Sequence, residues 1–400
     1  MKRLVILGAS GSIGSQTLEL IQDKKLNYKL VGISVGKKIV KIPLILKEFP
    51  TVKYICVQDE ENIFELKKKF PKIIFFGGDE GLIELINASK PNLVMNALVG
   101  FVGVAPTIET IKNNIDIALA NKESLVAAGE LIDRLLKRSK SKLYPVDSEH
   151  VAILKCLKGN DKKQVRRLVL TCSGGPFLNL KAKQMGKIKA KDAVKHPNWS
   201  MGLKISIDSA TLVNKVFEQI EAYYLFKNYT TNIDVVIHPE SICHSLVQYV
   251  DGTYIADIGD HDMRNPISYA LNENNYFDRD VNYDIEDVSN LTFIRPDKER
   301  LEVLNIAKYV IDTKGNLGAI LVAADDVLVN LFMEDLISFN DITTYLVKCL
   351  HDIPYIKNPS LKEILNTQEI VKKYLYKILK IDERKKKWIL EWYFYQFFVL

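Results

Sequence analysis

The chain has 400 residues, of which 47% are hydrophobic and 26% are charged, a composition typical of ordered globular proteins and not of disordered or fibrous ones. At roughly 150 residues per domain, this length predicts two to three domains with sizeable cores. The net charge of +6 comes from 55 Lys and Arg against 49 Asp and Glu. Such a dilute surplus does not indicate a nucleic-acid-binding protein, but it fits an anionic substrate or cofactor.

The cysteines and the chain ends indicate a cytosolic protein. The five cysteines are an odd number, lie far apart and form no C-x-x-C pair, so we expect neither a disulfide framework nor a zinc cluster. The first three residues lead directly into an apolar run, which leaves no room for a signal peptide or a transit segment. This favours a bacterial cytoplasmic protein, or a plastid protein whose transit segment was removed. The apolar stretch 388–400 contains Glu391 and is shorter than the roughly 20 residues of a membrane span, so we interpret it as a buried helix or strand.

Short β-rich runs alternate with amphipathic helical runs in the first part of the chain. The strand-like runs are 4–7, 30–35, 54–57, 93–96 and 117–120, and helical runs such as 16–22 and 39–47 separate them. Strands separated by helices predict a Rossmann-like, doubly wound parallel sheet, in a domain over residues 1–146.

The remaining chain predicts two further regions of α/β and α-helical class. Strand-like runs at 167–171, 205–208, 235–238 and 254–258 predict a central α/β domain over residues 147–275. Residues 276–299 belong to a polar, acidic stretch without periodicity, which we interpret as a linking arm. Helical periodicity then predicts a C-terminal helical bundle over residues 300–400.

A glycine loop follows the first predicted strand and opens the first helix. Gly8, Gly11 and Gly14 stand in a G-x-x-G-x-x-G pattern, and glycines at this point let the backbone approach a pyrophosphate at the helix N-terminus. Ser10, Ser12 and Ile13 lie between these glycines and are predicted to contact the cofactor with them. The alternative is a tight turn with a purely structural role.

The second predicted strand favours NADPH as the cofactor. An NAD site would place Asp or Glu at the end of this strand, but no acid occurs between Asp23 and Glu48. Gly36, Lys37 and Lys38 stand there instead, and two cations suit a ribose 2′-phosphate. The alternative is a loop with two exposed lysines.

Four consecutive residues, Asp147, Ser148, Glu149 and His150, follow the predicted strand at 143–146 and precede a predicted helix at 151–157. Two carboxylates two residues apart at a strand end can direct oxygen ligands at one hard divalent cation. The same sequence is also a good helix cap with Glu in the first turn, and this alternative stays open.

A second group of polar residues lies around a predicted helix start. Ser209, Asn214 and Lys215 offer hydroxyl, amide and ammonium donors to a phosphate, and Glu218 adds a further carboxylate.

These stretches together resemble the 1-deoxy-D-xylulose 5-phosphate reductoisomerase family of the non-mevalonate isoprenoid pathway, over nearly the whole chain. The motifs that carry the resemblance lie at 120–124 (ANKES), 147–150 (DSEH), 171–177 (TCSGGPF), 196–202 (HPNWSMG), 207–211 (IDSAT), 214–218 (NKVFE) and 238–241 (HPES). The resemblance implies a homodimer that uses NADPH and one Mg²⁺ or Mn²⁺ to rearrange and reduce 1-deoxy-D-xylulose 5-phosphate to 2-C-methyl-D-erythritol 4-phosphate.

The resemblance also implies roles for particular residues. The metal is held by Asp147, Glu149 and Glu218, while the substrate phosphate is held by Ser173, Ser209, Asn214 and Lys215. Ser148 contacts the substrate hydroxyls, Lys122 lies beside the reacting carbons and the metal ligands, and His150 orients the carboxylates. The further residues that it implies are His196 near the substrate, Trp199 on a flap near 196–205, and the cofactor contacts Asn121, Glu123 and Gly202.

The sequence departs from the family pattern at two places. Leu203 stands where many members have a basic residue, so we expect Lys204 to supply that charge near the entrance of the site. Asp325 and Asp326 replace the Asn-Glu of the usual A-A-N-E pattern, which concerns helix packing more than chemistry.

Several alternatives remain open. Taken alone, Trp199 could be a core aromatic, His196 a turn residue and His150 a helix-surface residue, whereas His238 and His244 favour structural roles. The alternative enzyme is an NADP-dependent reductase of the homoserine dehydrogenase type, and the non-enzyme alternative is an idle NADP-binding sensor. We expect neither nucleic-acid nor membrane partners.

Overall fold

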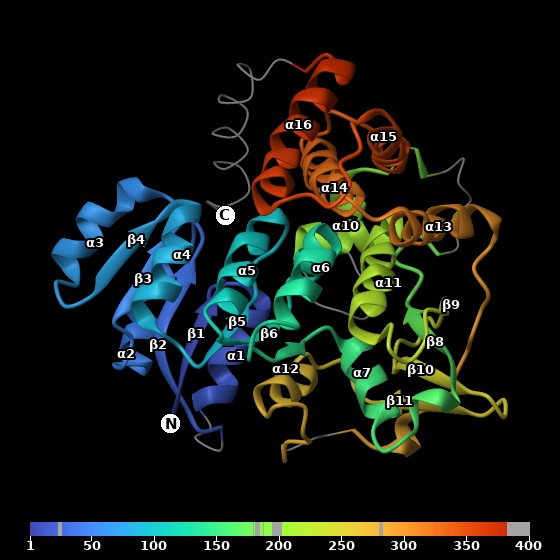
Figure 1. Cartoon of the computed structure of the whole chain (residues 1–400), viewed down its shortest axis with the longest axis horizontal. Helices are drawn as coiled ribbons and strands as arrows, with labels where there is room; N and C mark the ends of the chain where they lie inside the picture. The colour runs from blue at the N-terminus through green and yellow to red at the C-terminus, as the bar shows by residue number, and fades with distance from the viewer. Residues whose placement is uncertain are drawn as a thin grey trace.

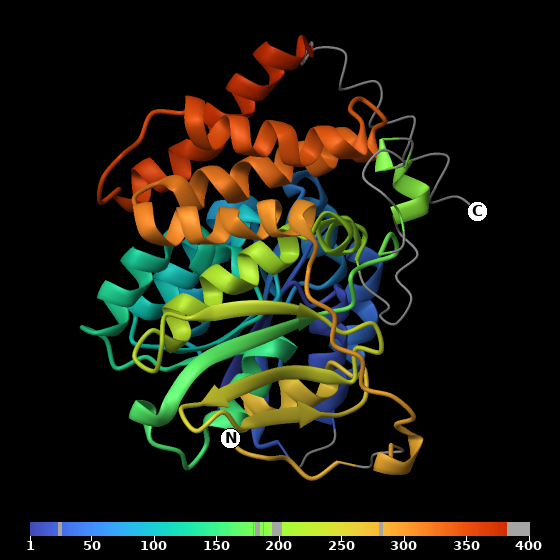
Figure 2. The ribbon, with the colours of Figure 1, turned by 90° about the vertical axis from the view of Figure 1, so that its right-hand side faces the viewer.

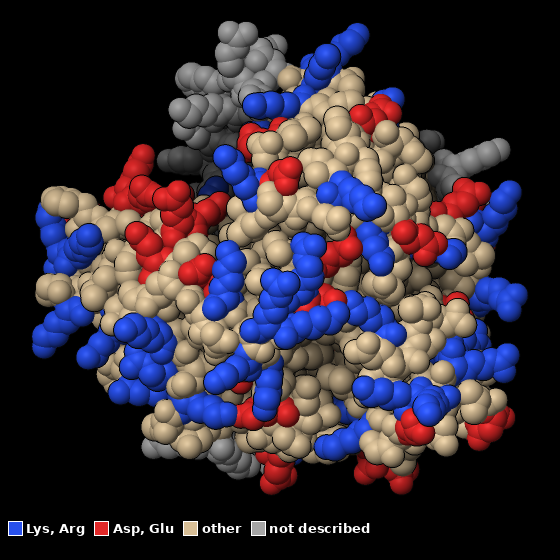
Figure 3. All heavy atoms as spheres, viewed as in Figure 1, with Lys and Arg blue, Asp and Glu red and all other residues tan. Residues whose placement is uncertain are grey.

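The computed structural model describes residues 1–22, 26–178, 180, 185–186, 188–193, 202–279 and 283–381. Figures 1 and 2 show a parallel sheet at one side of the molecule, a smaller sheet at the other and a layer of helices above both. No helix within these residues is both long and apolar enough to cross a lipid bilayer. In Figure 3, Lys and Arg side chains gather over α5 and α6, and fewer Asp and Glu lie among them.

The N-terminal sheet has seven parallel strands in the order β4-β3-β2-β1-β5-β6-β7. Because the chain proceeds outward from β1 to β4 and then returns to β5 beside β1, the winding reverses between β1 and β5. In doubly wound sheets, ligands bind at the carboxyl ends of the strands next to this reversal. The strands are β1 Lys2–Leu7, β2 Tyr28–Val35, β3 Tyr54–Val57, β4 Ile74–Gly77, β5 Leu93–Asn96, β6 Asp116–Leu119 and β7 Leu143–Pro145.

Successive residues of a strand point to opposite faces of the sheet, and helices cover both of these faces. Leu4 and Ile6 belong to a core formed with α1, α2, α3 and α12, whereas Val5 and Leu7 belong to a core formed with α4. The helices are α1 Ser12–Gln22, α2 Ile42–Glu48, α3 Ile63–Lys69, α4 Gly78–Ser89, α5 Val104–Lys112, α6 Lys122–Leu136 and α12 Arg264–Leu271.

The second sheet has four strands in the order β11-β10-β8-β9, of which only the β8–β9 pair is parallel. Figure 2 shows this sheet in front of helix α7 (Ser148–Leu157). Its elements and the helices between them are α7 Ser148–Leu157, β8 Val165–Cys172, α9 Ala190–Ala193, α10 Leu203–Thr211, α11 Val213–Phe226, β9 Ile233–Ile237, β10 Cys243–Tyr249 and β11 Tyr254–Ile258.

The C-terminal part is helical. A segment with little regular structure leads up to it along one side of the molecule (Figure 2) and contacts β9 through a bridge between Ile237 and Ile294. The largest core cluster joins these helices to α5, α6, α10 and α11, so the helical layer packs directly over the middle of the molecule. Its helices are α13 Lys298–Thr313, α14 Leu317–Met333, α15 Phe339–Asp352 and α16 Leu361–Leu379.

The doubly wound sheet, the central α/β region and the helical C-terminal region are confirmed, whereas the domain limits stay a prediction. The strand predicted at 205–208 is wrong, because these residues lie in helix α10. Ile205, Ser206, Ile207 and Asp208 alternate like a strand, yet the last three are all buried. A helix buried on several sides loses the 3.6-residue pattern by which sequence analysis finds it. The apolar stretch 388–400 lies outside the described residues.

Candidate active site

A cavity of about 180 Å³ lies where the parallel sheet, α11 and the second sheet meet. Its lining residues come from α1, the N-terminus of α6, the loop between β7 and α7, and the ends of β8 and α10. Twelve of the residues singled out from the sequence line it: Ser12, Ile13, Lys122, Asp147, Ser148, Glu149, Ser173, Gly202, Ser209, Asn214, Lys215 and Glu218.

Three carboxylates converge in this cavity. Asp147 precedes α7, Glu149 lies in its first turn and Glu218 comes from α11, and each offers an oxygen within 4.8 Å of the others. Asp147 stands at the N-cap position but makes no side-chain cap hydrogen bond, so the helix-cap alternative is wrong for this residue. Asp147 Oδ2 is buried and forms an ion pair with the ammonium group of Lys122. A converging set of hard oxygen donors fits Mg²⁺ or Mn²⁺.

The ammonium group of Lys122 lies between two of these carboxylates. It donates to Glu218 Oε1 at 2.9 Å and to Asn214 Oδ1 at 2.8 Å, and it forms an ion pair with Asp147. Burial disfavours its charge, but Asp147, Glu218 and Glu149 raise the pKa of Lys122 well above its usual value. Burial also raises the pKa of Asp147 to about 8, against the opposing effect of Lys122. Burial therefore favours the protonated form of Asp147, and the site has one more carboxyl group than it has ammonium groups.

Lys215 bridges Glu149 and Glu218. Its Nζ donates to Glu149 Oε1 at 2.8 Å and to Thr171 O at 2.6 Å, and it also bonds Glu218 Oε2. Burial opposes ionisation of Glu149, but Lys215 and Lys122 hold the pKa of this carboxyl well below its usual range. The predicted phosphate ligand Lys215 thus lies among the predicted metal ligands. Asn214 is shared in the same way, since its Nδ2 donates to Glu218 Oε1 at 2.6 Å.

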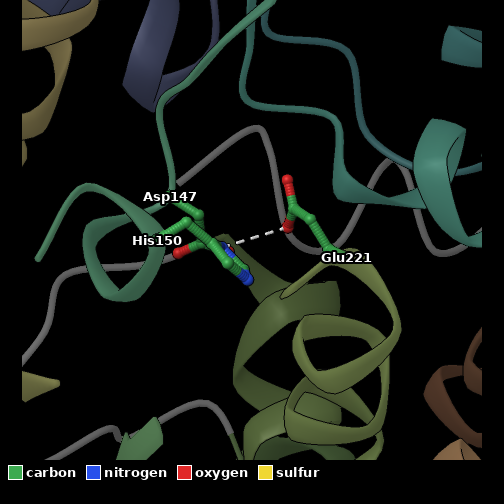
Figure 4. Close-up of side chains that lie close together, drawn as sticks. All are labelled: Asp147, His150 and Glu221. Atoms are coloured by element: carbon green, nitrogen blue, oxygen red, sulfur yellow. Dashed lines mark ion pairs between the residues drawn. The ribbon is translucent and has the colours of Figure 1, made fainter. Parts of the chain in front are cut away.

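His150 lies behind the cavity and links α7 to α11 (Figure 4). Its Nε2 lies 3.0 Å from the carbonyl oxygen of Glu218, so this nitrogen donates. Its Nδ1 lies 3.3 Å from Glu221 Oε2 and 4.0 Å from Asp147 Oδ2. Burial lowers the pKa of His150 to about 4, so its neutral ring holds the backbone of Glu218 in place. The helix-surface alternative for His150 is wrong, because its side chain is fully buried.

Asp147, His150 and Glu221 form a second group of possible metal ligands (Figure 4), and no sequence pattern pointed to Glu221. Burial and Asp147 raise the pKa of Glu221 well above its usual value, which favours a neutral carboxyl. Neither His150 nor Glu221 lines the cavity. An ion that must also reach a substrate therefore fits the group of Asp147, Glu149 and Glu218.

The glycine loop has the expected geometry between β1 and α1. Gly8 has a φ of +83°, and a side chain there would lie 2.6 Å from the carbonyl oxygen of Ala97, so the turn requires glycine. The backbone N–H of Gly8 donates to Ser34 Oγ at 2.8 Å. Gly8, Ser10 and Gly11 do not line the cavity itself, whereas Ser12 and Ile13 do.

Lys41 is a cation beside this loop that the sequence analysis missed. Its Nζ donates to the carbonyl oxygen of Ser10 at 3.0 Å and to Ser15 Oγ at 3.3 Å. Gly36, Lys37 and Lys38 are exposed at the end of β2. A lysine pattern of i, i+1 and i+4 at this strand end could have indicated all three lysines together.

Asn121 and Glu123 are occupied by contacts within the protein. Asn121 caps α6 by accepting from the backbone of Ser124, and its Nδ2 donates to the carbonyl oxygen of Gly100 at 2.9 Å. Glu123 accepts from Gly100 N at 2.8 Å and from Asn121 Nδ2 at 3.0 Å. Neither side chain lines the cavity, and their cofactor roles stay predictions.

Two predicted residues, His196 and Trp199, lie outside the described residues. His244, expected to be structural, lines the cavity together with Ser241 of the H-P-E-S motif and with Met263, and the sequence analysis gave neither of these two a role. The Nε2 of His244 lies 3.2 Å from the carbonyl oxygen of Asp260. A histidine on a strand next to the H-P-E-S motif was the available signal. His238 is fully buried, with Nδ1 2.8 Å from the carbonyl oxygen of Thr292.

Comparisons with known families place this geometry in context. Residues 4–129 match the family described as 1-deoxy-D-xylulose 5-phosphate reductoisomerase. Residues 143–226 match its C-terminal domain, and residues 258–374 match the family described as DXP reductoisomerase C-terminal domain. The three matches follow one another along almost the whole chain.

Proteins similar to this chain are named 1-deoxy-D-xylulose 5-phosphate reductoisomerase. The reductoisomerase of Caldanaerobacter subterraneus subsp. tengcongensis is 43% identical over 383 residues, covering 94% of this chain and all of the relative. That of Thermoanaerobacter sp. strain X514 is 42% identical over 380 residues, covering 94% and 99%. A solved DOX-P reductoisomerase in complex with NADPH, fosmidomycin and magnesium has a TM-score of 0.88 at 35% identity, covering 95% and 99%. The enzyme from Zymomonas mobilis in complex with NADPH has a TM-score of 0.85 at 31% identity, covering 95% and 100%. The chain belongs to the 1-deoxy-D-xylulose 5-phosphate reductoisomerase family.

Proposed function

We propose that the protein converts 1-deoxy-D-xylulose 5-phosphate to 2-C-methyl-D-erythritol 4-phosphate in isoprenoid precursor synthesis by the non-mevalonate pathway, with NADPH and a divalent metal ion. The observation that carries this proposal is one cavity in which three carboxylates, a set of phosphate donors and the end of the glycine loop meet. The family match supports it, as do solved relatives that bind NADPH and magnesium.

The metal-binding end of the site is proposed to comprise Asp147, Glu149 and Glu218, whose oxygens already converge. A Mg²⁺ or Mn²⁺ ion held there would act as a Lewis acid toward the carbonyl and hydroxyl oxygens of the substrate. His150 fixes Glu218 by donating to its backbone carbonyl. Lys122 contacts both Asp147 and Glu218, so its ammonium group can also stabilise negative charge that develops on a substrate oxygen.

The phosphate end is proposed to comprise Ser173, Ser209, Asn214 and Lys215, with Ser148 directed at the substrate hydroxyls. These residues line the same cavity as the carboxylates. Because Lys215 bonds both Glu149 and Glu218, a cation that takes over these carboxylates releases an ammonium group for the phosphate. Metal and substrate binding should therefore strengthen each other.

The cofactor end is proposed to comprise the loop from Gly8 to Ile13 and the residues Gly36, Lys37 and Lys38. Ser12 and Ile13 line the cavity from the side of the parallel sheet. NADPH bound to this loop would supply the hydride that reduces the aldehyde formed by the rearrangement. The exposed lysines at the end of β2 support NADPH over NADH, since they can meet a 2′-phosphate.

We also propose a homodimer, with the second copy seated on the open face of the second sheet. β11 is an edge strand, and it exposes Tyr254, Ile255 and Ile258 by 46, 40 and 37%. Phe293 and Leu301 are exposed as well and line, with Tyr254, a hollow of about 1280 Å³ beside this sheet. Exposed apolar surface of this kind marks interaction sites. Light scattering should show a dimer, and Ile255→Lys should shift it toward a monomer.

The proposed location is the cytosol of a bacterium. The five cysteines are all free thiols, in keeping with a reducing compartment, and the matched relatives are bacterial. The homoserine dehydrogenase alternative has no support left, since family matches extend from residue 4 to residue 374. The idle sensor is disfavoured because all three metal carboxylates are present and converge.

The direct test is oxidation of NADPH, followed by its absorbance, in the presence of 1-deoxy-D-xylulose 5-phosphate and Mg²⁺. We expect turnover that is lost when the metal is chelated and restored when Mg²⁺ or Mn²⁺ is added back. Absence of turnover at saturating metal and substrate would refute the proposed function.

A further inference from the structure

A buried ionic cluster lies outside the cavity, where α10 packs against α14. The Nζ of Lys204 donates to Asp208 Oδ2 at 2.7 Å, forms an ion pair with Asp325 and lies 3.6 Å from Asp326 Oδ1. The Lys204 side chain is 14% exposed, and that of Asp325 is fully buried. Lys204 therefore does not supply a positive charge at the entrance of the site, contrary to the expectation from the sequence.

The cluster connects three parts of the molecule. Asp326 accepts from the backbone N–H of Phe101 at 2.9 Å, in the loop that follows β5. The neighbouring Gly100 N–H donates to Glu123, on the first turn of the helix that carries Lys122. α10, α14 and the carboxyl edge of the parallel sheet are thus joined by consecutive polar contacts.

Helix α10 uses different sides for the cluster and for the cavity. Gly202, Ile205 and Ser209 line the cavity, and their spacing places them on one side of the helix. Lys204 and Asp208 are four residues apart and share the other side, toward α14. A contact that holds the Lys204 side of α10 against α14 therefore also fixes how far Ser209 extends into the cavity.

The cluster holds one ammonium group against three carboxylates. Burial raises the pKa of Asp208 to about 6 and that of Asp325 to about 7, despite the opposing effect of Lys204. Apolar side chains of similar volume would often stabilise such a position at least as well. What the ionic contacts add is a defined geometry, since each oxygen restricts where Nζ can lie.

We propose that Lys204, clamped by Asp325 and Asp326, is a positioning residue that holds α10 so that Ser209 meets the substrate phosphate. This inference rests on the proposed function, because it concerns the phosphate end of that site. Lys204 itself does not line the cavity.

The test replaces Lys204 by Met, which keeps the length of the side chain and removes its charge. Hydrogen exchange of residues 203–211 should become faster in Lys204→Met, while exchange in α11 and α16 stays unchanged. The KM for the sugar phosphate and the inhibition constant of inorganic phosphate should both rise about tenfold, with kcat within about threefold of the wild type. Lys204→Arg, which keeps the charge, should restore both constants.

A matched control is Lys189→Met. Lys189 pairs with Asp335 at 3.2 Å, but both side chains are largely exposed, so its loss should change neither exchange nor KM. Faster exchange in 203–211 with an unchanged KM would refute the positioning role, and unchanged exchange would refute the clamp itself. The exchange measurement needs no turnover, so it separates failure of this inference from failure of the proposed function.

If Lys204→Met does not fold, a triple variant that combines Lys204→Met with Asp208→Asn and Asp325→Asn removes the buried charges that the single replacement leaves unpaired. The clamp is equally absent from this triple variant, and the same tenfold rise in KM is expected. A wild-type KM in the folded triple variant would overturn the proposal.

Discussion

Replacing Lys215 by Met should separate metal binding from substrate binding at the candidate site. The Nζ of Lys215 bonds Glu149 at 2.8 Å and also Glu218, and its side chain is 4% exposed. At an effective dielectric constant of about 20, two unit charges 4 Å apart interact by about 4 kcal/mol. Removing this cation leaves both carboxylates to the metal. Since about 1.4 kcal/mol already changes an equilibrium tenfold, Mg²⁺ affinity should rise by at least about tenfold.

The effect on the sugar phosphate has the opposite sign. Lys215 is the proposed cation for the phosphate, and a hydrogen bond to a charged group contributes about 1.5–3 kcal/mol, which corresponds to a KM increase of roughly tenfold to more than a hundredfold. Calorimetric Mg²⁺ titration without substrate and initial rates of NADPH oxidation measure the two constants. Lys155→Met is the control, because Lys155 pairs with Asp257 at 3.0 Å outside this cavity. Weaker Mg²⁺ binding, or an unchanged substrate KM, in Lys215→Met would refute this reasoning.

Three further predictions concern the metal, the cofactor and the pH dependence of stability. Glu218→Gln leaves two lysines facing two carboxylates, so the protein should still fold, while Mg²⁺ affinity and turnover should fall together by at least about tenfold. Replacing Lys37 and Lys38 by Ala should raise the KM for NADPH and leave that for NADH nearly unchanged, and Lys41→Met should do the same to a lesser degree. Burial and Asp208 raise the pKa of Asp325 in the folded protein from 3.8 to about 7. In the unfolded protein Asp325 loses its proton at a lower pH than in the folded protein. The free energy of unfolding therefore falls as pH rises from about 4 to 7. Asp325→Asn should remove this loss, which is at most about 4 kcal/mol, and so stabilise the protein at pH 8 but not at pH 4.

Each of these predictions has a result that contradicts it. Wild-type turnover of Glu218→Gln across a Mg²⁺ titration would remove Glu218 from the metal site, and a lower melting temperature with full activity would assign it a structural role. Equal effects of the lysine replacements on NADPH and NADH would show that these lysines do not bind the 2′-phosphate. Denaturant titrations of Asp325→Asn that run parallel to the wild type from pH 4 to 8 would show that Asp325 is ionised throughout.

Local features of the sequence were enough to predict much of the parallel sheet and the cofactor loop. The strand at Lys2–Leu7, the glycines after it and the helix from Ser12 follow one another within a short stretch, and each depends on neighbouring residues only. The turn at Gly8 needs a positive φ, which the residue type itself indicates. The end of the second strand, where no acid occurs and Lys37 and Lys38 stand, is likewise a feature of neighbouring residues only.

The tertiary structure decided what lies next to what. Glu218 reaches Asp147 and Glu149 only because α11 packs beside the end of β7 and the start of α7, and no spacing in the sequence encodes that distance. The sequence resemblance assigned Lys215 to a phosphate, but only the packing shows it bonded to Thr171 and to two carboxylates.

Burial accounts for the remaining differences between the sequence and the structure. Residues 205–208 alternate like a strand but lie in helix α10, and the burial of three of them hides the helical pattern from sequence analysis. Lys204 looked like a solvent-exposed charge, but Asp325 and Asp326 on α14 enclose it. A sequence determines which groups can ionise and which short segments can turn. The folded chain determines which of those groups lose water, and the cost of that dehydration selects their partners.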